Sequence, residues 1–174
     1  VPKEWADKYK GKFDAGWDKL REETIARQKK LGVIPGDCDL TARHGEIPSW
    51  DETPEAFKPV LRREMEVYAG FLEYTDHHVG QLLDGLKKLG IFEDTLVYYI
   101  IGDNGASAEG GINGCFNEMS YFNGLQALET PEYLSARLDK LGGPESYNHY
   151  AVGWAHAMNT PYQWTKQVAS HWGG

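Results

Sequence analysis

The chain has 174 residues, of which 41% are hydrophobic and 25% are charged, and its formal net charge at pH 7 is −8. These values are typical of a folded domain with one hydrophobic core, and no apolar run is long enough to span a bilayer. The acidic balance argues against a nucleic-acid-binding surface, because such a surface needs clustered lysine and arginine residues to neutralise phosphates.

The first part of the chain is predicted to be helical. From Pro2 to Lys30, large apolar residues recur every three or four positions with charged residues between them, which is the pattern of an amphipathic helix. Gly11 and Gly16 weaken this prediction, because glycine is a poor helix former. The stretch from Leu31 to Glu52 contains glycines and two prolines and has no apolar period, so we expect an extended loop that is long enough to lie near a functional site.

A longer helix is predicted next. It is expected to begin at Thr53 and Pro54, where an N-cap candidate precedes a proline at the first helical position. Apolar positions then follow one helix face as far as Gly90. Such a length is unusual without a kink, so we expect that Gly70 or Gly80 either bends the helix or allows close packing.

The stretch from Thr95 to Gly111 carries the main chemical signal. Leu96 to Ile101 form a short apolar run rich in β-branched and aromatic residues, which predicts a buried strand. Asp103, Asn104 and Gly105 follow it, and Asp-Asn-Gly taken alone is interpreted most simply as a reverse turn. At the carboxyl end of a strand, however, a carboxylate and an amide lie where open α/β sheets bind ligands.

The remaining segments are shorter. The glycine-rich part from Ala106 to Asn123 predicts a mobile or close-approach loop. A short helix is expected over Glu118 to Leu128, and Thr130 is expected to begin another that ends at the Gly-Gly-Pro of residues 142–144. The final segment is dense in aromatic residues and histidines and contains a single lysine, Lys166.

The order of these motifs resembles the sulfatase family of the alkaline-phosphatase-like superfamily, and most of all its bacterial arylsulfatase type. The similarity covers the Asp-x-x-Val-Gly-x-Leu-Leu pattern that begins at Asp76, the Leu-Gly-x-x-x-Asp-Thr-Leu-Val link over Leu89 to Val97, and Gly-Asp-Asn-Gly-Ala-Ser-Ala-Glu-Gly over Gly102 to Gly110. This resemblance implies an α/β fold with helices packed on a mostly parallel sheet, of which the present piece is helix-rich. Both chain ends resemble the interior of that domain, so we expect residues 1–174 to be part of one sulfatase catalytic domain with both ends missing.

The resemblance also implies an activity, namely the hydrolysis of sulfate esters of small molecules by the full-length protein. It implies that Asp103 and Asn104 bind a divalent metal, which we expect to be Ca²⁺ or Mg²⁺ because both donors are hard oxygens. Lys166 is implied to contact the sulfate, although its spacing to the final Gly-Gly pair is about one residue longer than in the commoner family form. The alternative for Lys166 is an ordinary exposed lysine.

The family's nucleophile is a formylglycine made from Cys or Ser in the pattern Cys/Ser-x-Pro/Ala-x-Arg. Neither Cys38 nor Cys115 begins this pattern, so we expect the nucleophile outside this segment and the segment alone to be inactive. Two cysteines are too few for a disulfide framework. Each is expected to be a structural or free thiol, and a single bridge between them is the open alternative.

Two alternative functions stay open. One is hydrolysis of phosphate or phosphonate esters on the same scaffold, although Asn104 favours a sulfatase, because the phosphatases tend to have Asp-His at this place. The other is a non-catalytic helical interaction module, which would show an exposed apolar patch and no metal dependence. His149, His156 and His171 could line the same pocket as Lys166, and no pattern separates the roles of ligand, proton donor and filler. No targeting pattern indicates a compartment.

Overall fold

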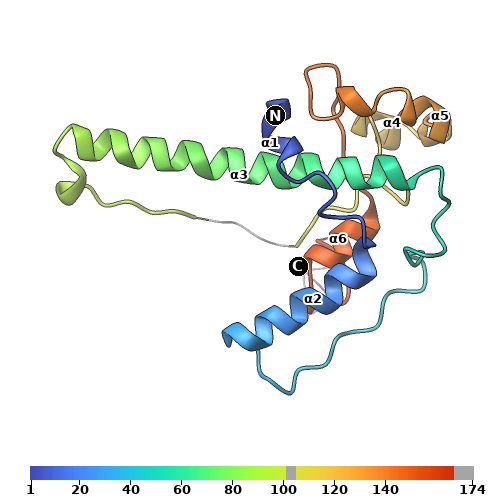
Figure 1. The fold of residues 1–174 in the computed structure, drawn as a ribbon, viewed down its shortest axis with the longest axis horizontal. Helices are drawn as coiled ribbons and strands as arrows, with labels where there is room; N and C mark the ends of the chain where they lie inside the picture. Colours follow the sequence, from blue (N-terminus) through green and yellow to red (C-terminus); the bar gives the residue numbers. More distant parts are fainter. Residues whose placement is uncertain (101–104, 167–174) are drawn as a thin grey trace.

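The structure is a computed structural model, and it describes residues 1–100 and 105–166. The described part is built on one long helix, α3, with α1 across its middle, α5 near its N-terminal end, and α2 paired with α6 on another side (Figure 1). The α-helices are α1 (Lys3–Asp7), α2 (Gly16–Leu31), α3 (Lys58–Lys88), α4 (Glu118–Phe122), α5 (Pro131–Ser135) and α6 (Val152–Met158), and the 3-10 helices are η1 (Phe92–Asp94), η2 (Gln126–Leu128) and η3 (Leu138–Lys140).

A cluster of three tryptophans forms the centre of the first core. The ring centroids of Trp17 and Trp50 lie 4.8 Å apart, and those of Trp17 and Trp154 lie 5.5 Å apart, both in edge-to-face geometry. Such aromatic pairs are favourable beyond the area that they bury. The indole of Trp154 also donates to the Leu61 carbonyl at 2.9 Å. This core therefore joins α2, α3 and α6, and it includes Tyr150 and Ala151 just before α6.

A second, smaller core lies between α1, α3 and residues 116–141. Its buried members are Ala6, Val60, Val67, Phe116, Leu134 and Leu141. Because Val60 and Val67 lie on the same helix as Leu61 of the tryptophan core, α3 contributes to both clusters. The N-terminal half of α3 is thus the common support of the described part.

The predicted helix over Pro2 to Lys30 is wrong in its middle, where the chain turns between α1 and α2. Gly11 and Gly16 have φ angles of 78° and 77°, which are outside the helical range and favour glycine. A Cβ atom on Gly16 would lie 2.1 Å from Cγ of Trp50. The close approach of Trp50 therefore decides where α2 begins, and the 3.6-residue period could not show it.

The predicted long helix is confirmed, but its first turn is placed wrongly by the sequence. Thr53 donates its hydroxyl to the carbonyl of Ser49 at 2.9 Å, which closes a turn instead of capping the helix. α3 begins at Lys58 and runs through both candidate glycines. Of the two expected roles of glycine here, close packing is observed at Gly70, where a Cβ atom would lie 2.6 Å from the backbone nitrogen of Ala6.

The predicted buried strand is the largest difference in the described part. Residues 95–100 form no strand, and Leu96 and Ile100 are 77% and 84% exposed. A strand needs a neighbouring strand for its backbone hydrogen bonds. In the described ranges, only two isolated bridges are present, between Cys115 and His149 and between Asn117 and Tyr147. The expected mostly parallel sheet is therefore not seen there, whereas the expected helix-rich character is.

The shorter elements agree in part with the prediction. Thr130 begins a helix as expected, because its side chain accepts a hydrogen bond from the backbone of Tyr133 at 3.2 Å. That helix ends at Ser135 and does not continue to residues 142–144. Cys38 and Cys115 are both free thiols, so no bridge joins them. None of the described helices is both long and apolar enough to cross a membrane.

Candidate functional site

The structure places only part of the predicted site. Asp103 and Asn104, the predicted metal ligands, and His171 lie outside the described residues. Lys166 is described, and so is the loop that follows Asn104 in the sequence. Within residues 1–100 and 105–166, no group of three or more His, Cys, Asp or Glu residues is arranged to hold a metal ion. The site is therefore built here from Lys166 and its neighbours.

The backbone of Lys166 is held against the loop after Asn104. Its N–H donates to the carbonyl of Ala106 at 3.0 Å. The N–H of Ala106 in turn donates to the side-chain oxygen of Asn159 at 2.7 Å, and the Asn159 amide donates to the carbonyl of Trp164 at 2.6 Å. Asn159 is buried at the C-terminal end of α6. One buried amide thus joins the two segments that the sequence analysis singled out.

The side chain of Lys166 forms an ion pair with Glu109. Its Nζ lies 2.9 Å from Oε1 of Glu109, and the two side chains are 34% and 22% exposed. Burial acts to raise the pKa of Glu109, but the hydrogen bond and the positive charge of Lys166 outweigh it, so the pKa of this carboxyl is lowered. Glu109 is therefore an ionised carboxylate at neutral pH.

His149 lies beside this ion pair. Its Nδ1 is 2.9 Å from the carbonyl oxygen of Tyr150, and its Nε2 is 2.8 Å from Oγ of Ser107 and 4.0 Å from Oε2 of Glu109. A carbonyl oxygen can only accept, so the hydrogen-bond network assigns a proton to Nδ1. In the neutral ring, Nε2 then accepts the hydroxyl proton of Ser107.

Backbone pairing explains why these residues meet. His149 exchanges two backbone hydrogen bonds with Cys115, at 3.0 and 3.1 Å. The N–H of Ser107 donates to the hydroxyl of Tyr150 at 3.2 Å. A Cβ atom on Gly110 would lie 2.1 Å from the carbonyl oxygen of Tyr150, so the loop can approach this closely only with glycine at that position.

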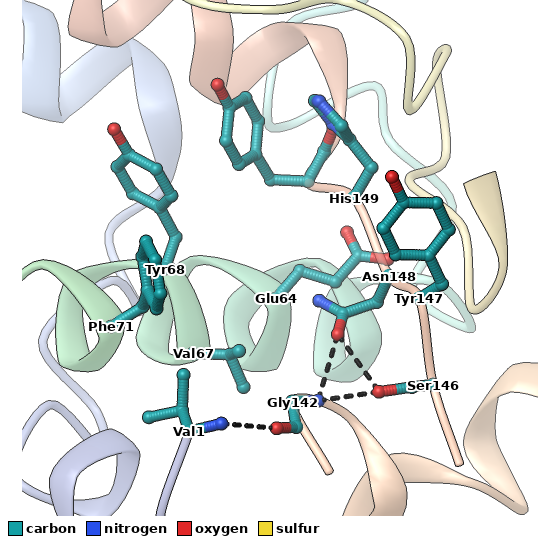
Figure 2. A pocket seen from close by; sticks show the side chains of 11 residues that line it. Val1, Glu64, Val67, Tyr68, Phe71, Gly142, Ser146, Tyr147, Asn148 and His149 are labelled. Atoms are coloured by element: carbon teal, nitrogen blue, oxygen red, sulfur yellow. Dashed lines mark hydrogen bonds between the residues drawn. The ribbon is translucent and has the colours of Figure 1, made fainter. Parts of the chain in front are cut away.

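A cavity of about 440 Å³ shares His149 and Tyr150 with this cluster. Figure 2 shows its walls, with Glu64, Tyr68 and Phe71 from α3 on one side and Tyr147, Asn148 and His149 on the other. Glu64 is only 1% exposed, and within the described residues no hydrogen bond of good geometry reaches its carboxyl oxygens, although the backbone N–H groups of Ala151 and Cys115 lie close enough to act on its pKa. Burial, and next the nearby charge of Glu129, raise the pKa of Glu64 well above its usual value. Burial of this wall of the cavity therefore favours the protonated, uncharged form of Glu64.

His156 lies apart from the Lys166 cluster. It is 1% exposed, and its Nε2 is 2.9 Å from the carbonyl of Gln163. Burial, with the charge of Arg21, lowers the pKa of His156 to about 4. The ring is therefore neutral and serves as a buried structural group, which is one of the roles that the sequence left open.

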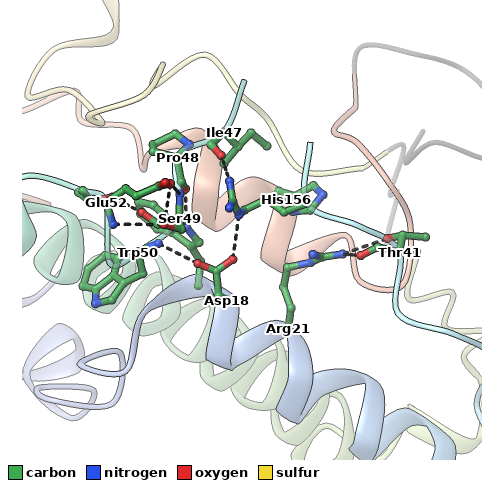
Figure 3. Close-up of polar contacts among 12 residues, drawn as sticks. Asp18, Arg21, Thr41, Ile47, Pro48, Ser49, Trp50, Glu52 and His156 are labelled. Carbon is green, nitrogen blue, oxygen red and sulfur yellow. Dashed lines mark hydrogen bonds and ion pairs between the residues drawn. The ribbon is translucent and has the colours of Figure 1, made fainter. Parts of the chain in front are cut away.

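The loop that was expected to lie near a functional site is held by polar contacts around α2, and Figure 3 shows these contacts together with His156. Arg21 donates to the carbonyl and the hydroxyl of Thr41 at 2.7 and 3.0 Å, and Thr41 donates to the carbonyl of Pro161 at 2.9 Å. Asp18 accepts the N–H of Trp50 at 2.8 Å. This loop therefore supports the chain that leads from α6 to Lys166, and none of its side chains pairs with Glu109 or Lys166 in the described part.

Chemically, the cluster combines a cation, a carboxylate, an imidazole and a hydroxyl. The ammonium of Lys166 can bind an oxyanion, because Lys has three N–H donors and Glu109 uses one of them. Ser107 and His149 also have the spacing of a nucleophile and its base. Sequence reasoning did not assign roles to Ser107 and Glu109, although both lie in the Gly102 to Gly110 run that carries the family resemblance.

Comparison with known proteins gives a family match along the whole chain. The family model described as Sulfatase matches residues 1–174. The chain is 33% identical over 169 residues to an uncharacterized sulfatase of Schizosaccharomyces pombe. The aligned region covers 95% of this chain and 28% of the relative. It is 31% identical over 179 aligned positions to an arylsulfatase of Klebsiella aerogenes. This aligned region covers 100% of this chain and 35% of the relative. The chain thus spans roughly a third of the length of these curated relatives.

Proposed function

The chain belongs to the sulfatase family, and we propose that it is part of the catalytic domain of a longer protein that hydrolyses sulfate esters of small molecules. The observation that carries this proposal is the hydrogen bond from the backbone of Lys166 to Ala106. It brings the predicted sulfate-binding lysine to the loop that follows the predicted metal ligands, Asp103 and Asn104. An exposed lysine at a random surface position would not be expected to meet this loop.

In this proposal, Lys166 binds a sulfate oxygen through the two N–H donors that Glu109 leaves available. The negative charge on the sulfate oxygens grows and shifts as the ester bond breaks, and a fixed cation beside them stabilises the transition state. The partial burial of Lys166 strengthens this effect, because solvent screens the charge less than at an exposed position.

Asp103 and Asn104 are proposed as ligands of Ca²⁺ or Mg²⁺. A carboxylate and an amide are hard oxygen donors, which fit these ions better than zinc, for which His or Cys would be expected. Two donors are too few for a tight site, so further ligands are proposed to come from outside residues 1–174. When bound, such an ion draws charge off the sulfate oxygens. The formylglycine nucleophile is proposed to lie outside this segment as well.

The interaction-module alternative predicts an exposed apolar patch, and the described part has one. The C-terminal half of α3 and the chain after it project from the other helices (Figure 1), and Leu82, Leu89 and Leu96 are exposed there. A partial sulfatase domain would expose the same surface, because the part of the full-length domain that would cover it lies outside this segment. The patch is therefore compatible with both functions, and only an assay of activity separates them.

The test is turnover of 4-nitrophenyl sulfate and 4-nitrophenyl phosphate by the full-length protein that carries this sequence, with and without EDTA. We expect metal-dependent turnover in which kcat/KM is higher for the sulfate. A higher kcat/KM for the phosphate would favour the phosphate-ester alternative, and no turnover of either ester would favour the interaction module. The segment of residues 1–174 alone is expected to stay at the buffer rate, since it lacks the nucleophile pattern.

A further inference from the structure

We propose that Glu109 is a positioning residue that holds the Lys166 ammonium for the sulfate, which is a role that rests on the proposed function of Lys166. Glu109 Oε1 lies 2.9 Å from Nζ of Lys166. Within the described ranges, Glu109 is the one acidic residue that forms an ion pair with this lysine. The sequence motif assigns no role to Glu109, so the assignment comes from the tertiary contact.

The backbone that carries Glu109 is fixed on both sides. The N–H of Ser107 donates to the hydroxyl of Tyr150, and Gly110 packs against the carbonyl of the same residue, where a Cβ atom would lie at 2.1 Å. The N–H of Val152, at the start of α6, donates to the carbonyl of Gly111 at 2.7 Å. The carboxylate is thus presented from a loop that α6 and the segment before it hold in place.

Lys166 needs such a partner because its ammonium is carried on a flexible four-carbon stem. A bound oxyanion would otherwise have to order this side chain itself, which weakens binding. The pair is partly buried, at 34% and 22% exposure, so water screens it less than a surface ion pair. Among the described residues only Glu109 pairs with the ammonium, which leaves two of its three donors available for sulfate oxygens.

The second oxygen of Glu109 supports a positioning role over a substrate-binding role. Oε2 is buried and has no hydrogen-bond partner in the described part, and it faces Nε2 of His149 at 4.0 Å. The carboxylate therefore lies between Lys166 and His149. A carboxylate would repel a sulfate, so we place the sulfate on the opposite side of the Lys166 ammonium.

A double-mutant cycle in the full-length protein tests this proposal. The variants are Glu109→Gln, Lys166→Ala and the double variant, and kcat/KM is measured with 4-nitrophenyl sulfate. Because contacting residues are coupled, we expect Glu109→Gln alone to lower kcat/KM about tenfold and to have little further effect in the Lys166→Ala background. Glu109→Asp, which keeps the charge but shortens the side chain, should show an intermediate kcat/KM.

The matched control is the surface ion pair of Lys140 and Glu145, whose Nζ and Oε2 atoms lie 2.6 Å apart. Glu145→Gln removes the same kind of contact from an exposed pair that involves neither Lys166 nor Glu109, and it should leave kcat/KM unchanged. The inhibition constant of inorganic sulfate, a competitive inhibitor, is a second measurement. If Glu109 had a purely structural role, Glu109→Gln would not change this constant in a way that depends on Lys166. We expect Glu109→Gln to weaken this inhibition only when Lys166 is present.

The possible failures are distinguishable. If Lys166→Ala leaves kcat/KM unchanged, the proposed function of Lys166 fails, and the role of Glu109 fails with it. If Lys166→Ala lowers kcat/KM but Glu109→Gln lowers it by the same factor in both backgrounds, only the positioning role is overturned. If Glu109→Gln does not fold, the cycle is repeated with Glu109→Asp, and equal losses in both backgrounds again reject the proposal.

Discussion

Lys166 donates its backbone N–H to the carbonyl of Ala106 at 3.0 Å, although the two residues lie in segments far apart in the chain. This one bond places the C-terminal lysine beside the loop that follows Asp103 and Asn104. The side-chain ion pair between Lys166 and Glu109 forms at the same junction. The candidate site therefore depends on how the segment after α6 packs against the loop.

Replacing Lys166 by Ala in the full-length protein should lower kcat/KM for an aryl sulfate about a hundredfold, because one preorganised contact to the developing charge is lost. Steady-state kinetics measures this effect. Lys140→Ala removes a lysine from another ion pair at the surface and should leave kcat/KM unchanged. Equal kinetics for both variants and the wild type would place Lys166 among ordinary surface lysines.

Asp103→Ala and Asn104→Ala should each weaken the affinity of the full-length protein for Ca²⁺ or Mg²⁺ by at least about tenfold, because each removes an oxygen donor. Isothermal titration of the metal-free protein measures the affinity directly and needs no substrate. Asp84→Ala, in the exposed pair with Lys87, is the control and should leave it unchanged. If the titrations of all three variants match the wild type, neither residue is a ligand.

Ser107→Ala should change turnover of the full-length protein by less than about twofold, because the nucleophile is expected elsewhere and the Ser107 hydroxyl contributes two ordinary hydrogen bonds, one with Nε2 of His149 and one from the backbone N–H of Glu109. The hydroxyl lies 2.8 Å from Nε2 of His149, so a Ser-His nucleophile pair is the competing interpretation. If Ser107 were that nucleophile, loss of its hydroxyl would remove nearly all activity. A rate for Ser107→Ala close to the uncatalysed rate would therefore identify Ser107 as the nucleophile.

Gly16→Ala should destabilise the full-length protein more than Gly32→Ala. Both glycines have positive φ angles, of 77° and 70°, so both substitutions introduce backbone strain of about 1 kcal/mol. A Cβ atom on Gly16 would also lie 2.1 Å from Trp50, whereas nothing lies within 4 Å of one on Gly32. Overpacking then adds about 2 kcal/mol to the loss at Gly16. Urea unfolding measures both variants, and equal losses would contradict the packing of Trp50 over Gly16.

Glu64→Gln should make the free energy of unfolding depend less on pH. The pKa of Glu64 is raised well above 4.5 in the folded state, mainly by burial. Above pH 4.5 the unfolded chain has lost this proton while the folded chain keeps it, so stability falls as the pH rises toward the folded-state pKa. Urea unfolding of the full-length protein is measured at intervals of about one pH unit between pH 4 and 8. The free energy of unfolding should change less with pH for Glu64→Gln than for the wild type. Glu145→Gln, at the surface, should keep the wild-type slope.

Much of the helical structure could be predicted because it follows from local patterns. The apolar face of α3 repeats along the helix, and the cap of Thr130 on α5 depends on residues three positions apart. The start of α3 was missed, since Thr53 bonds to Ser49 and does not cap the helix. The buried strand was predicted but is not observed over Leu96 to Ile100, because no partner strand for it is among the described residues, and β pairing is never a local property.

The candidate site was predictable only as a set of residue types. The run around Asp103 and the lone lysine of the final segment resembled the sulfatase family, and the whole-chain match confirms that family. The sequence could not show that Glu109 meets Lys166, or that His149 and not His156 lies beside them. His149 and His156 are similar in sequence setting, and only burial and hydrogen bonding separate them.

The sequence by itself therefore determined the family and the long helix α3, because motif order and helical period are properties of neighbouring residues. Only the tertiary structure decided that Glu109 pairs with Lys166 and that Gly16 ends the turn before α2. Both depend on contacts between distant segments, one made through Ala106 and the other by the ring of Trp50. Such contacts follow from the packing of the whole core and leave no spacing pattern in the chain.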